Sequence, residues 1–456
     1  MNILDKIVSD RRKSLARDRA LAAGFPKRTI PVTPFFNGPR TFIIAEFKRA
    51  SPAEGRLGGC SYDQLARDYR RGGVRRFSVL TEHKYFQGSL ADLYRLKQKY
   101  PRWGFLRKDF LFCTEDIAHA YRAGADAVLL IAEILSGGLL QALIAEAHKY
   151  KLQVLCEAHS LQALQKILKL KNLPDAIGLN SRDLQTFQIQ PDWPLRLKAY
   201  LPPNVPVVYE SGVNTGYLLK IIGNAGFRAA LIGTAAVRAA GRARTIRNFI
   251  NALRRGAGQP PNFFTRLYAA KKNIYVKICG LTNKADVKLA ARAGADAAGF
   301  IFVPDSPRFT SAELLRAVKN IKILKIAVVK KVTPEIKKLL RAGLLDAVQT
   351  YNEADIYALA GSAYLAAADL RRRALPVTLY DAPKTSALVK GRRIPARKHR
   401  LIRGQWLAGG LTPRNIRRMI RSMRPSLVDV SSGVEKRPGV KDRQKMLDFV
   451  QEVARA

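Results

Sequence analysis

Cysteine is scarce in this chain of 456 residues, which holds only Cys60, Cys113, Cys156 and Cys279. The four are widely spaced, with no CxxC pair and no cluster of cysteine with histidine. This scatter argues against a zinc site and against a disulfide framework, so we expect no metal. Unpaired cysteines suit a reducing compartment, and we therefore expect a cytoplasmic protein.

Long apolar runs are also missing. No stretch reaches the roughly 18 uninterrupted apolar residues that indicate a membrane-spanning helix, so we expect no membrane partner. The N-terminal stretch MNILDKIVSDRRKSLARDR (residues 1–19) lacks the apolar centre of a signal peptide. It predicts an amphipathic, polar helix instead. These features indicate a soluble, intracellular protein.

Acidic residues are few, since 35 Asp and Glu face 80 Lys and Arg, which gives a formal net charge of +45. A field of this strength favours anionic partners, either phosphorylated small molecules or a polyanion. The alternative is compositional, with Lys and Arg filling exposed helix faces and no partner involved. Composition alone leaves both interpretations open.

One hexapeptide, RAGADA, occurs twice, at 122–127 and at 292–297, and a weaker copy, RAGLLDAV, begins at Arg341. In each full copy a glycine, Gly124 or Gly294, follows a helical pattern and precedes an apolar run. Glycine takes the left-handed conformation that ends a helix. Short apolar runs after helices are typical of parallel strands buried on both faces. RAGADA therefore predicts a connector from helix to strand.

Eight apolar runs that alternate with helical patterns occur in each half of the chain. In the first half they span 41–47, 77–80, 104–110, 127–133, 152–158, 175–180, 205–212 and 229–235. In the second half they span 273–280, 297–303, 325–330, 347–351, 363–367, 376–381, 405–410 and 427–433. An open doubly wound sheet is the alternative, but no GxGxxG turn is present. We predict an α/β fold of two consecutive (β/α)₈ TIM barrels, the first with an N-terminal helical extension.

Chemistry in a TIM barrel belongs at the carboxyl ends of the strands. The first half places acid, base and amide groups there, namely Glu46, Lys48, Lys108, Glu157, Asn180, Arg182 and Glu210. A single charge at such a position is commonly a solvated rim residue. Convergence of the whole set instead favours a pocket whose groups shift one another's pKa values, as proton transfer requires.

Glycines follow the seventh and eighth strands of the first half, in the pairs Ser211-Gly212 and Gly233-Thr234. A glycine can simply form a turn. At these two strands, however, it lets backbone N–H groups approach a phosphate. We predict a phosphate site here.

The second half repeats the scheme with other side chains. Lys277 and Cys279 share one face of its first strand, Asp381 ends the sixth, and Arg308 lies in the loop after the second. Its seventh and eighth strands end in Gly409, Gly410, Ser431, Ser432 and Gly433. A cysteine in so apolar a context usually packs in a core. At a strand mouth facing an aspartate, it can instead act as a base with a lowered pKa.

Several longer motifs resemble two known families. IIAEFKRASP (43–52), LTEHKYFQGS (80–89), LRKDF (106–110), GLNSRDL (178–184), YESGV (209–213) and LIGTA (231–235) resemble indole-3-glycerol phosphate synthase. VKICGLTN (276–283), GFIFVPDSPR (299–308), LAGGLTPRNI (407–416) and VDVSSGVEKRPGVKD (428–442) resemble phosphoribosylanthranilate isomerase. The resemblance implies a synthase barrel over 1–255, a linker over 256–272 that contains GAGQPP, and an isomerase barrel over 273–456.

The resemblance implies two consecutive reactions of tryptophan biosynthesis, a lyase step and an isomerase step. The isomerase would convert N-(5-phosphoribosyl)anthranilate into carboxyphenylamino-deoxyribulose phosphate by an Amadori rearrangement. Cys279 would be its general base and Asp381 its general acid, while Arg308 would hold the anthranilate carboxylate. Gly409, Gly410, Ser432 and Gly433 would bind its phosphate.

The synthase would then close the indole ring with loss of CO₂ and water. Lys108 would be the general acid at the carbonyl and Glu157 its partner in dehydration. The side chains that would position substrate and tune those two are Glu46, Lys48, Asn180, Arg182, Glu210 and Ser211, with Gly212, Gly233 and Thr234 at the phosphate. The substrates would be phosphorylated, anthranilate-derived small molecules. The resemblance implies no cofactor, and we expect a monomer.

Two departures from the isomerase pattern keep an alternative open. The family's Gln-Leu-His-Gly after the fourth strand is Gln349-Thr350-Tyr351-Asn352 here, and its glycine-rich loop after the sixth strand is Leu388-Val389-Lys390-Gly391. Lost glycines remove space and backbone freedom beside a phosphate. The chain could therefore have synthase activity only, with the second barrel as a scaffold.

Nucleic-acid binding is the other alternative, carried by basic stretches such as KGRRIPARKHR (390–400). No stacking platform, helix-turn-helix or finger motif accompanies those stretches. We therefore expect no specific nucleic-acid partner.

Overall fold

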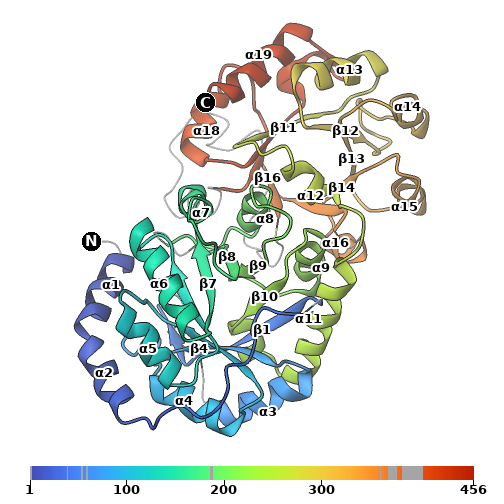
Figure 1. Ribbon diagram of the computed structural model, residues 1–456. Helices are drawn as coiled ribbons and strands as arrows, with labels where there is room; N and C mark the ends of the chain where they lie inside the picture. Colours follow the sequence, from blue (N-terminus) through green and yellow to red (C-terminus); the bar gives the residue numbers. More distant parts are fainter. Residues whose placement is uncertain are drawn as a thin grey trace. The chain divides into compact units, whose positions relative to one another are not determined.

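The computed structural model describes residues 3–38, 40–52, 55–57, 60–184, 188–359, 361–367, 377–382 and 404–456. The chain divides into two compact units, Met1–Pro260 and Pro261–Ala456. Each unit contains a closed barrel of eight parallel strands (Figure 1). The predicted fold class, two consecutive TIM barrels with helices ahead of the first, is confirmed.

Each run predicted in the first half contains the core of one barrel strand. The strands are β1 (Phe42–Phe47), β4 (Arg76–Leu80), β5 (Gly104–Lys108), β6 (Ala127–Ile131), β7 (Gln153–Ala158), β8 (Ala176–Asn180), β9 (Val207–Glu210) and β10 (Ala229–Ile232). The helices are α1 (Ile3–Lys13), α2 (Leu15–Ala23), α3 (Tyr62–Gly72), α4 (Leu90–Lys99), α5 (Thr114–Arg122), α6 (Gly137–Lys149), α7 (Leu161–Leu168), α8 (Trp193–Lys198), α9 (Gly216–Asn224), α10 (Thr234–Arg238) and α11 (Arg242–Gly256). A short hairpin of β2 (Ala50–Ser51) and β3 (Gly55–Arg56) follows β1.

The second unit has the same order of elements. Its barrel strands are β11 (Tyr275–Cys279), β12 (Ala297–Ile301), β13 (Leu324–Val329), β14 (Ala347–Thr350), β15 (Ala363–Ala367), β16 (Thr378–Asp381), β17 (Trp406–Ala408) and β18 (Leu427–Val430). Its helices include α12 (Phe263–Tyr268), α13 (Lys284–Ala293), α14 (Ala312–Ala317), α15 (Pro334–Arg341), α16 (Glu353–Ala358), α18 (Ile416–Met423) and α19 (Arg443–Ala454). Within the described part of the chain, every helix is too short or too polar to cross a membrane.

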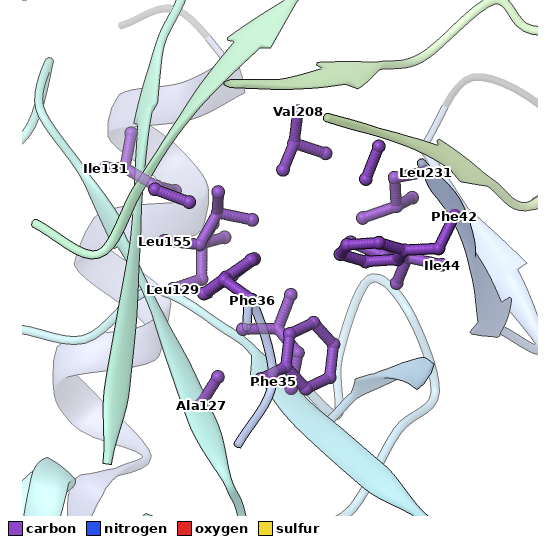
Figure 2. Packing of buried hydrophobic residues seen from close by; sticks show 13 residues of the cluster. Phe35, Phe36, Phe42, Ile44, Ala127, Leu129, Ile131, Leu155, Val208 and Leu231 are labelled. Carbon is purple, nitrogen blue, oxygen red and sulfur yellow. The ribbon is translucent and has the colours of Figure 1, made fainter. Parts of the chain in front are cut away.

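The first barrel is filled by side chains that its strands send inward. Figure 2 shows Ile44, Leu129, Leu155 and Val208 pointing toward a common centre. Phe35 and Phe36, from the segment ahead of β1, join this cluster beside the first residues of the strands. The barrel interior is thus a packed core, and a cavity lies at the carboxyl ends of the strands.

The aspartate of RAGADA has a structural task that the repeat alone did not reveal. Asp126, directly before β6, accepts the backbone N–H of Phe105 in β5 at 2.9 Å. The pattern recurs before β8, β12 and β14, where the aspartate oxygens accept backbone N–H groups of β7, β11 and β13: Asp175 from Val154, Asp296 from Val276, and Asp346 from Lys325. Each aspartate therefore joins two successive strands. The glycines of both RAGADA copies have the predicted left-handed backbone.

Asp126 also compensates a buried cation. The Nζ of Lys97, which is fully buried, donates to both carboxylate oxygens of Asp126 at 3.0 and 2.8 Å. Arg28 donates to the same carboxylate at 2.9 Å. Burial lowers the pKa of Lys97 although Asp126 opposes this effect. This aspartate thus combines a strand contact with charge compensation in the interior.

The N-terminal helices are tied to the barrel by a buried ion network. Arg11 of α1 donates to Asp18 of α2 at 2.8 Å and to Asp109 and Asp116 of the barrel, each at 3.0 Å. Arg107 of β5 donates to Asp18 at 2.7 Å and to Asp109 at 3.1 Å. Burial is tolerated because each charge lies beside charges of opposite sign. The predicted single N-terminal helix is two helices, separated at Ser14.

The segment expected to be a linker, 256–272, contains helix α12. Phe263 stacks on Tyr364 with ring centroids 6.0 Å apart, and Phe264 packs on Trp406 at 6.2 Å. These buried aromatic side chains make residues 263–268 part of the core of the second unit. The connecting stretch is therefore shorter than the expected one.

Replacement of Asp126 by alanine is expected to lower the free energy of unfolding by about 3–5 kcal/mol, because Lys97 stays buried without its carboxylate. The matched control is Asp175→Ala, which removes the same strand contact beside the more exposed His148. This control should cost about 1–2 kcal/mol. Urea denaturation followed by circular dichroism measures both variants. Equal losses would show that the buried ion pair adds nothing to the strand contact.

Candidate active site

A cavity of about 420 Å³ lies at the carboxyl ends of the first barrel's strands. It is lined by all the side chains and glycines predicted for the synthase: Glu46, Lys48, Lys108, Glu157, Asn180, Arg182, Glu210, Ser211, Gly212, Gly233 and Thr234. Leu4 and Ile7 of α1 add an apolar wall, and Leu129 and Leu231 of the barrel core also line it. The structure thus brings the predicted residues of this half together in one place.

Lys108, the last residue of β5, lies between two carboxylates. Its Nζ donates to Glu157 Oε2 at 3.0 Å and to Glu210 Oε2 at 2.8 Å. Burial works to lower the pKa of Lys108, but Glu157 and then Glu210 outweigh burial and raise that pKa. The amine is therefore a cation, and it can donate a proton or a hydrogen bond to a substrate oxygen.

The two carboxylates that hold Lys108 differ in pKa. Burial and the neighbouring charge of Glu157 raise the pKa of Glu210 to about 8, and its Oε1 is buried without a hydrogen-bond partner. Burial also acts to raise the pKa of Glu157, but Lys108 and His159 hold it well below its ordinary value. One protonated and one ionised carboxyl in one pocket is the arrangement that acid–base chemistry needs.

His159 belongs to this site, and the sequence analysis missed it. Its Nε2 lies 2.5 Å from Glu157 Oε1 and its Nδ1 lies 2.8 Å from the carbonyl oxygen of Arg182. Burial acts to lower the pKa of His159, but Glu157 raises it to about 9. The available signal was its position two residues after Glu157, because side chains two residues apart on an extended chain point to the same side.

Glu46 and Lys48 face the cavity from the end of β1. Lys48 Nζ lies 3.4 Å from Glu46 Oε1 and donates to Thr234 Oγ1 at 3.2 Å. A Cβ atom on Gly233 would lie 2.6 Å from Glu46 Oε1, so glycine at this position makes room for the carboxylate. The loop after β10, predicted to bind phosphate, and the charged pair on β1 are thereby packed together.

The loop after β9 has an unusual backbone. Ser211 and Gly212 have φ angles of 65° and 69°, both in the left-handed region. A Cβ atom on Gly212 would also lie 2.5 Å from Ile189 Cγ2, so this position requires glycine for both reasons. Turns of this kind form concave backbone surfaces that bind anions.

Cys279 ends β11 in the second barrel and is 7% exposed. Burial raises the pKa of its thiol, and Lys277 opposes burial only in part, so the predicted lowering of this pKa is not found. The Nζ of Lys277 donates to Asp429 at 2.6 Å and to Gln349 at 2.7 Å, and it also lies within hydrogen-bonding reach of the thiol. The thiol thus shares its neighbouring cation with Asp429 and Gln349.

Arg308 packs against the loop that follows Cys279, since a Cβ atom on Gly280 would lie 2.6 Å from Arg308 Cδ. Its guanidinium donates from Nε and Nη2 to the carboxylate of Glu435 at 2.9 and 2.7 Å. Glu435 also accepts from Lys441 at 2.8 Å. Sequence reasoning did not find this carboxylate partner, which fixes the plane of the guanidinium.

Asp381 ends β16 and accepts a hydrogen bond from Tyr351 Oη at 3.0 Å. Tyr351 is one of the residues that depart from the isomerase pattern. Partial burial raises the pKa of Tyr351, and Asp381 and Cys279 raise it further. Tyr351 therefore lies within electrostatic reach of both residues predicted to carry the chemistry of the second barrel.

The predicted glycines of the second barrel form tight turns. Gly409 and Gly410 have φ angles of 87° and 64°, and a Cβ atom on Gly433, beside Ser432, would lie 1.8 Å from the carbonyl oxygen of Leu411. The altered loop Leu388–Gly391 lies outside the described residues. Among the residues the structure describes, there is no group of three or more His, Cys, Asp or Glu side chains that could hold a metal ion.

Comparison with known proteins adds the family. Residues 4–249 match the family model of indole-3-glycerol phosphate synthase. The chain belongs to the indole-3-glycerol phosphate synthase family. A synthase of Koribacter versatilis is 36% identical over 261 residues, which cover 54% of this chain and 98% of that protein. One from Geobacillus thermodenitrificans is 36% identical over 219 residues, which cover 47% of this chain and 83% of that protein.

The second half of this synthase-family chain matches another model. Residues 386–452 match N-(5'-phosphoribosyl)anthranilate isomerase, a stretch that includes Gly409, Gly410, Ser432 and Gly433. A crystal structure of phosphoribosylanthranilate isomerase from Thermotoga maritima is 30% identical, with a TM-score of 0.35, and covers 40% of this chain and 100% of that chain. The chain thus joins a synthase and an isomerase of tryptophan biosynthesis, a lyase and an isomerase in one polypeptide.

Replacement of Gly178 by alanine tests the geometry of the synthase cavity. The new Cβ atom would lie 2.1 Å from Glu210 Oε1, so the carboxyl must move away from Lys108. We expect synthase kcat to fall by about 100-fold. Gly137→Ala is the control, because no atom lies within 4 Å of a Cβ at that position. Wild-type turnover in the Gly178→Ala enzyme would contradict the assigned geometry.

Replacement of Tyr351 by phenylalanine removes the hydroxyl that orients Asp381. We expect isomerase kcat to fall by about tenfold, the loss of one hydrogen bond to a charged group. Synthase turnover in the same protein should stay unchanged. Tyr357→Phe, at an exposed position on α16, is the matched control. Steady-state assays with each substrate measure both rates, and an unaltered isomerase rate would exclude this task for Tyr351.

Proposed function

We propose that the two barrels catalyse consecutive steps with the residues located above. In the first step, N-(5-phosphoribosyl)anthranilate undergoes Amadori rearrangement to carboxyphenylamino-deoxyribulose phosphate. In the second, this product closes to indole-3-glycerol phosphate with loss of CO₂ and water. The synthase proposal depends above all on Lys108, held as a cation between Glu157 and Glu210.

In the synthase barrel, Lys108 is proposed as the general acid at the substrate carbonyl, which becomes the electrophile for ring closure. Glu157, ionised at rest, accepts and returns a proton during the dehydration that follows loss of CO₂. Glu210 keeps Lys108 aimed at the carbonyl. Glu46, Lys48, Asn180 and Arg182 position the substrate, and Ser211, Gly212, Gly233 and Thr234 bind its phosphate. The proposal is supported by the closeness of these groups in one cavity.

In the isomerase barrel, Asp381 is proposed as the general acid that opens the sugar ring, and Cys279 as the base that removes a proton from the sugar carbon. The raised pKa of the Cys279 thiol requires that Lys277 stabilise the thiolate as it forms. Arg308 donates from Nε and Nη2 to Glu435. Its Nη1 is therefore proposed to donate to the substrate carboxylate. Gly409, Gly410, Ser432 and Gly433 are proposed to bind the phosphate.

The finer properties of the enzyme are also proposals. We propose a cytoplasmic monomer without a cofactor and without a specific nucleic-acid partner. The four cysteines are free, which suits a reducing compartment. Light scattering tests whether the protein is a monomer. Tight binding of a fluorescent oligonucleotide at physiological salt would contradict the proposed lack of a nucleic-acid partner.

The proposed function is tested by supplying the purified protein with each substrate separately. Lys108→Ala should lower synthase turnover by at least about 1000-fold and leave the isomerase rate unchanged. Cys279→Ala should lower isomerase turnover by a similar factor and leave the synthase rate unchanged. If the wild-type protein shows synthase turnover but no isomerase turnover, the second barrel is a scaffold.

A further inference from the structure

His159 contacts two residues of the proposed machinery, the carboxylate of Glu157 and the backbone carbonyl of Arg182. It follows β7, and its side chain is 6% exposed at the edge of the synthase cavity. Its backbone is fixed on two sides, because its N–H donates to Glu133 Oε1 at 2.7 Å and its carbonyl accepts from Trp193 Nε1 at 2.8 Å. The ring is therefore held in place independently of its contact with Glu157.

The hydrogen bonds of the ring determine where its protons lie. The carbonyl oxygen of Arg182 can only accept, so Nδ1 must carry a proton. One more proton lies between Nε2 and Glu157 Oε1, on either the imidazole or the carboxyl. The pair is therefore either imidazolium with carboxylate or neutral imidazole with carboxylic acid.

Other donors at Glu157 decide between these two states. Asn180 Nδ2 donates to Oε1 at 2.9 Å, and its amide is oriented by the Arg182 N–H that its own Oδ1 accepts. Lys108 donates to Oε2. Two donors other than His159 on one carboxyl group, one of them already a cation, favour the carboxylate. The remaining proton then belongs to His159.

The charges around this pair come from several strands. Glu157 faces Lys108 from β5 and Glu210 from β9, and His159 also lies near Glu133 from the loop after β6. The carboxylates of Glu133 and Glu157 both favour a charged ring. Arg182 meets the ring through its carbonyl oxygen, a neutral acceptor.

We propose that His159 is a positioning residue of the synthase: as an imidazolium bonded to Oε1, it keeps Glu157 ionised and leaves Oε2 to Lys108. The inference rests on the proposed function of Glu157. The imidazolium of His159 is a second cation beside Glu157, in addition to Lys108. Glu157 therefore stays a carboxylate even when Lys108 turns toward substrate. His159 thus controls the ionisation of Glu157 without contacting the reacting atoms.

His159→Gln tests the charge while keeping a neutral N–H within reach of Glu157. Without the imidazolium the pKa of Glu157 rises, so the acid limb of the synthase kcat/KM profile should move up by about one to three pH units. At pH values above this limb, the kcat/KM of the variant should come closer to that of wild type. A side chain needed only for packing would lower the rate equally at every pH. An acid limb that coincides with that of wild type overturns the proposal.

His148→Gln is the matched control, because His148 pairs with Asp175 at 3.0 Å on the exposed side of the barrel. Its acid limb should coincide with that of wild type, and a limb that moves as far as in His159→Gln would also overturn the proposal. Ionisable groups of the substrate affect the pH profiles of wild type and both variants equally, so they do not change this comparison.

A second measurement does not depend on turnover or on a variant of His159. In wild-type protein with isotopically labelled histidine, NMR should show both ring nitrogens of His159 protonated at about pH 7. Its signal is assigned by replacing the other histidines one at a time. A neutral ring overturns the proposal. If wild type lacks synthase turnover, the proposed function fails, whereas an unmoved limb in an active enzyme refutes the role of His159 alone.

Discussion

Closure of eight parallel strands is the constraint on which both candidate sites depend. β1 pairs with β10 on one side and with β4 on the other, so the strands of the first barrel end on one rim. Alternate strands send side chains into the same layer of such a barrel. Glu46, Lys108, Glu157 and Glu210 come from β1, β5, β7 and β9, the alternate strands of this ring. The groups proposed for proton transfer meet because the ring closes, although they lie far apart in the chain.

Much of this arrangement was predictable from sequence, because strand order and strand ends are local features. Apolar runs located the strands of both barrels, and polar residues at their ends located the synthase cavity. The ends themselves were less certain. The run 104–110 was expected to be one strand, but β5 ends at Lys108 because Asp109 turns into the ion network with Arg11.

Contacts between distant residues were not predictable in this way. Arg11 and Asp109 are 98 residues apart, and Arg308 and Glu435 are 127 apart, with no local pattern that pairs them. His159 is different, because its spacing from Glu157 was visible in the sequence. A single histidine did not indicate a site until the carbonyl of Arg182, from the loop after β8, defined its protonation.

Burial of carboxylates also bears on the charge of the molecule. Among the described residues, more Asp and Glu than Lys and Arg are buried, including Asp109, Asp126, Glu157 and Glu210. The surface that meets solvent is therefore even more basic than the net charge of +45 indicates. Phosphorylated substrates therefore approach through a positive field, while the carboxylates proposed to act on them lie inside the cavity.

The aspartates that precede β6, β8, β12 and β14 divide each barrel into modules. Each one fastens a strand to its successor, so the unit of two strands and the helix between them carries its own cross-link. Cuts between such modules leave these links intact, whereas cuts inside a module break one. Circular permutants and complementing fragments of this chain are therefore best designed with new termini at module borders, such as the α6 region between β6 and β7.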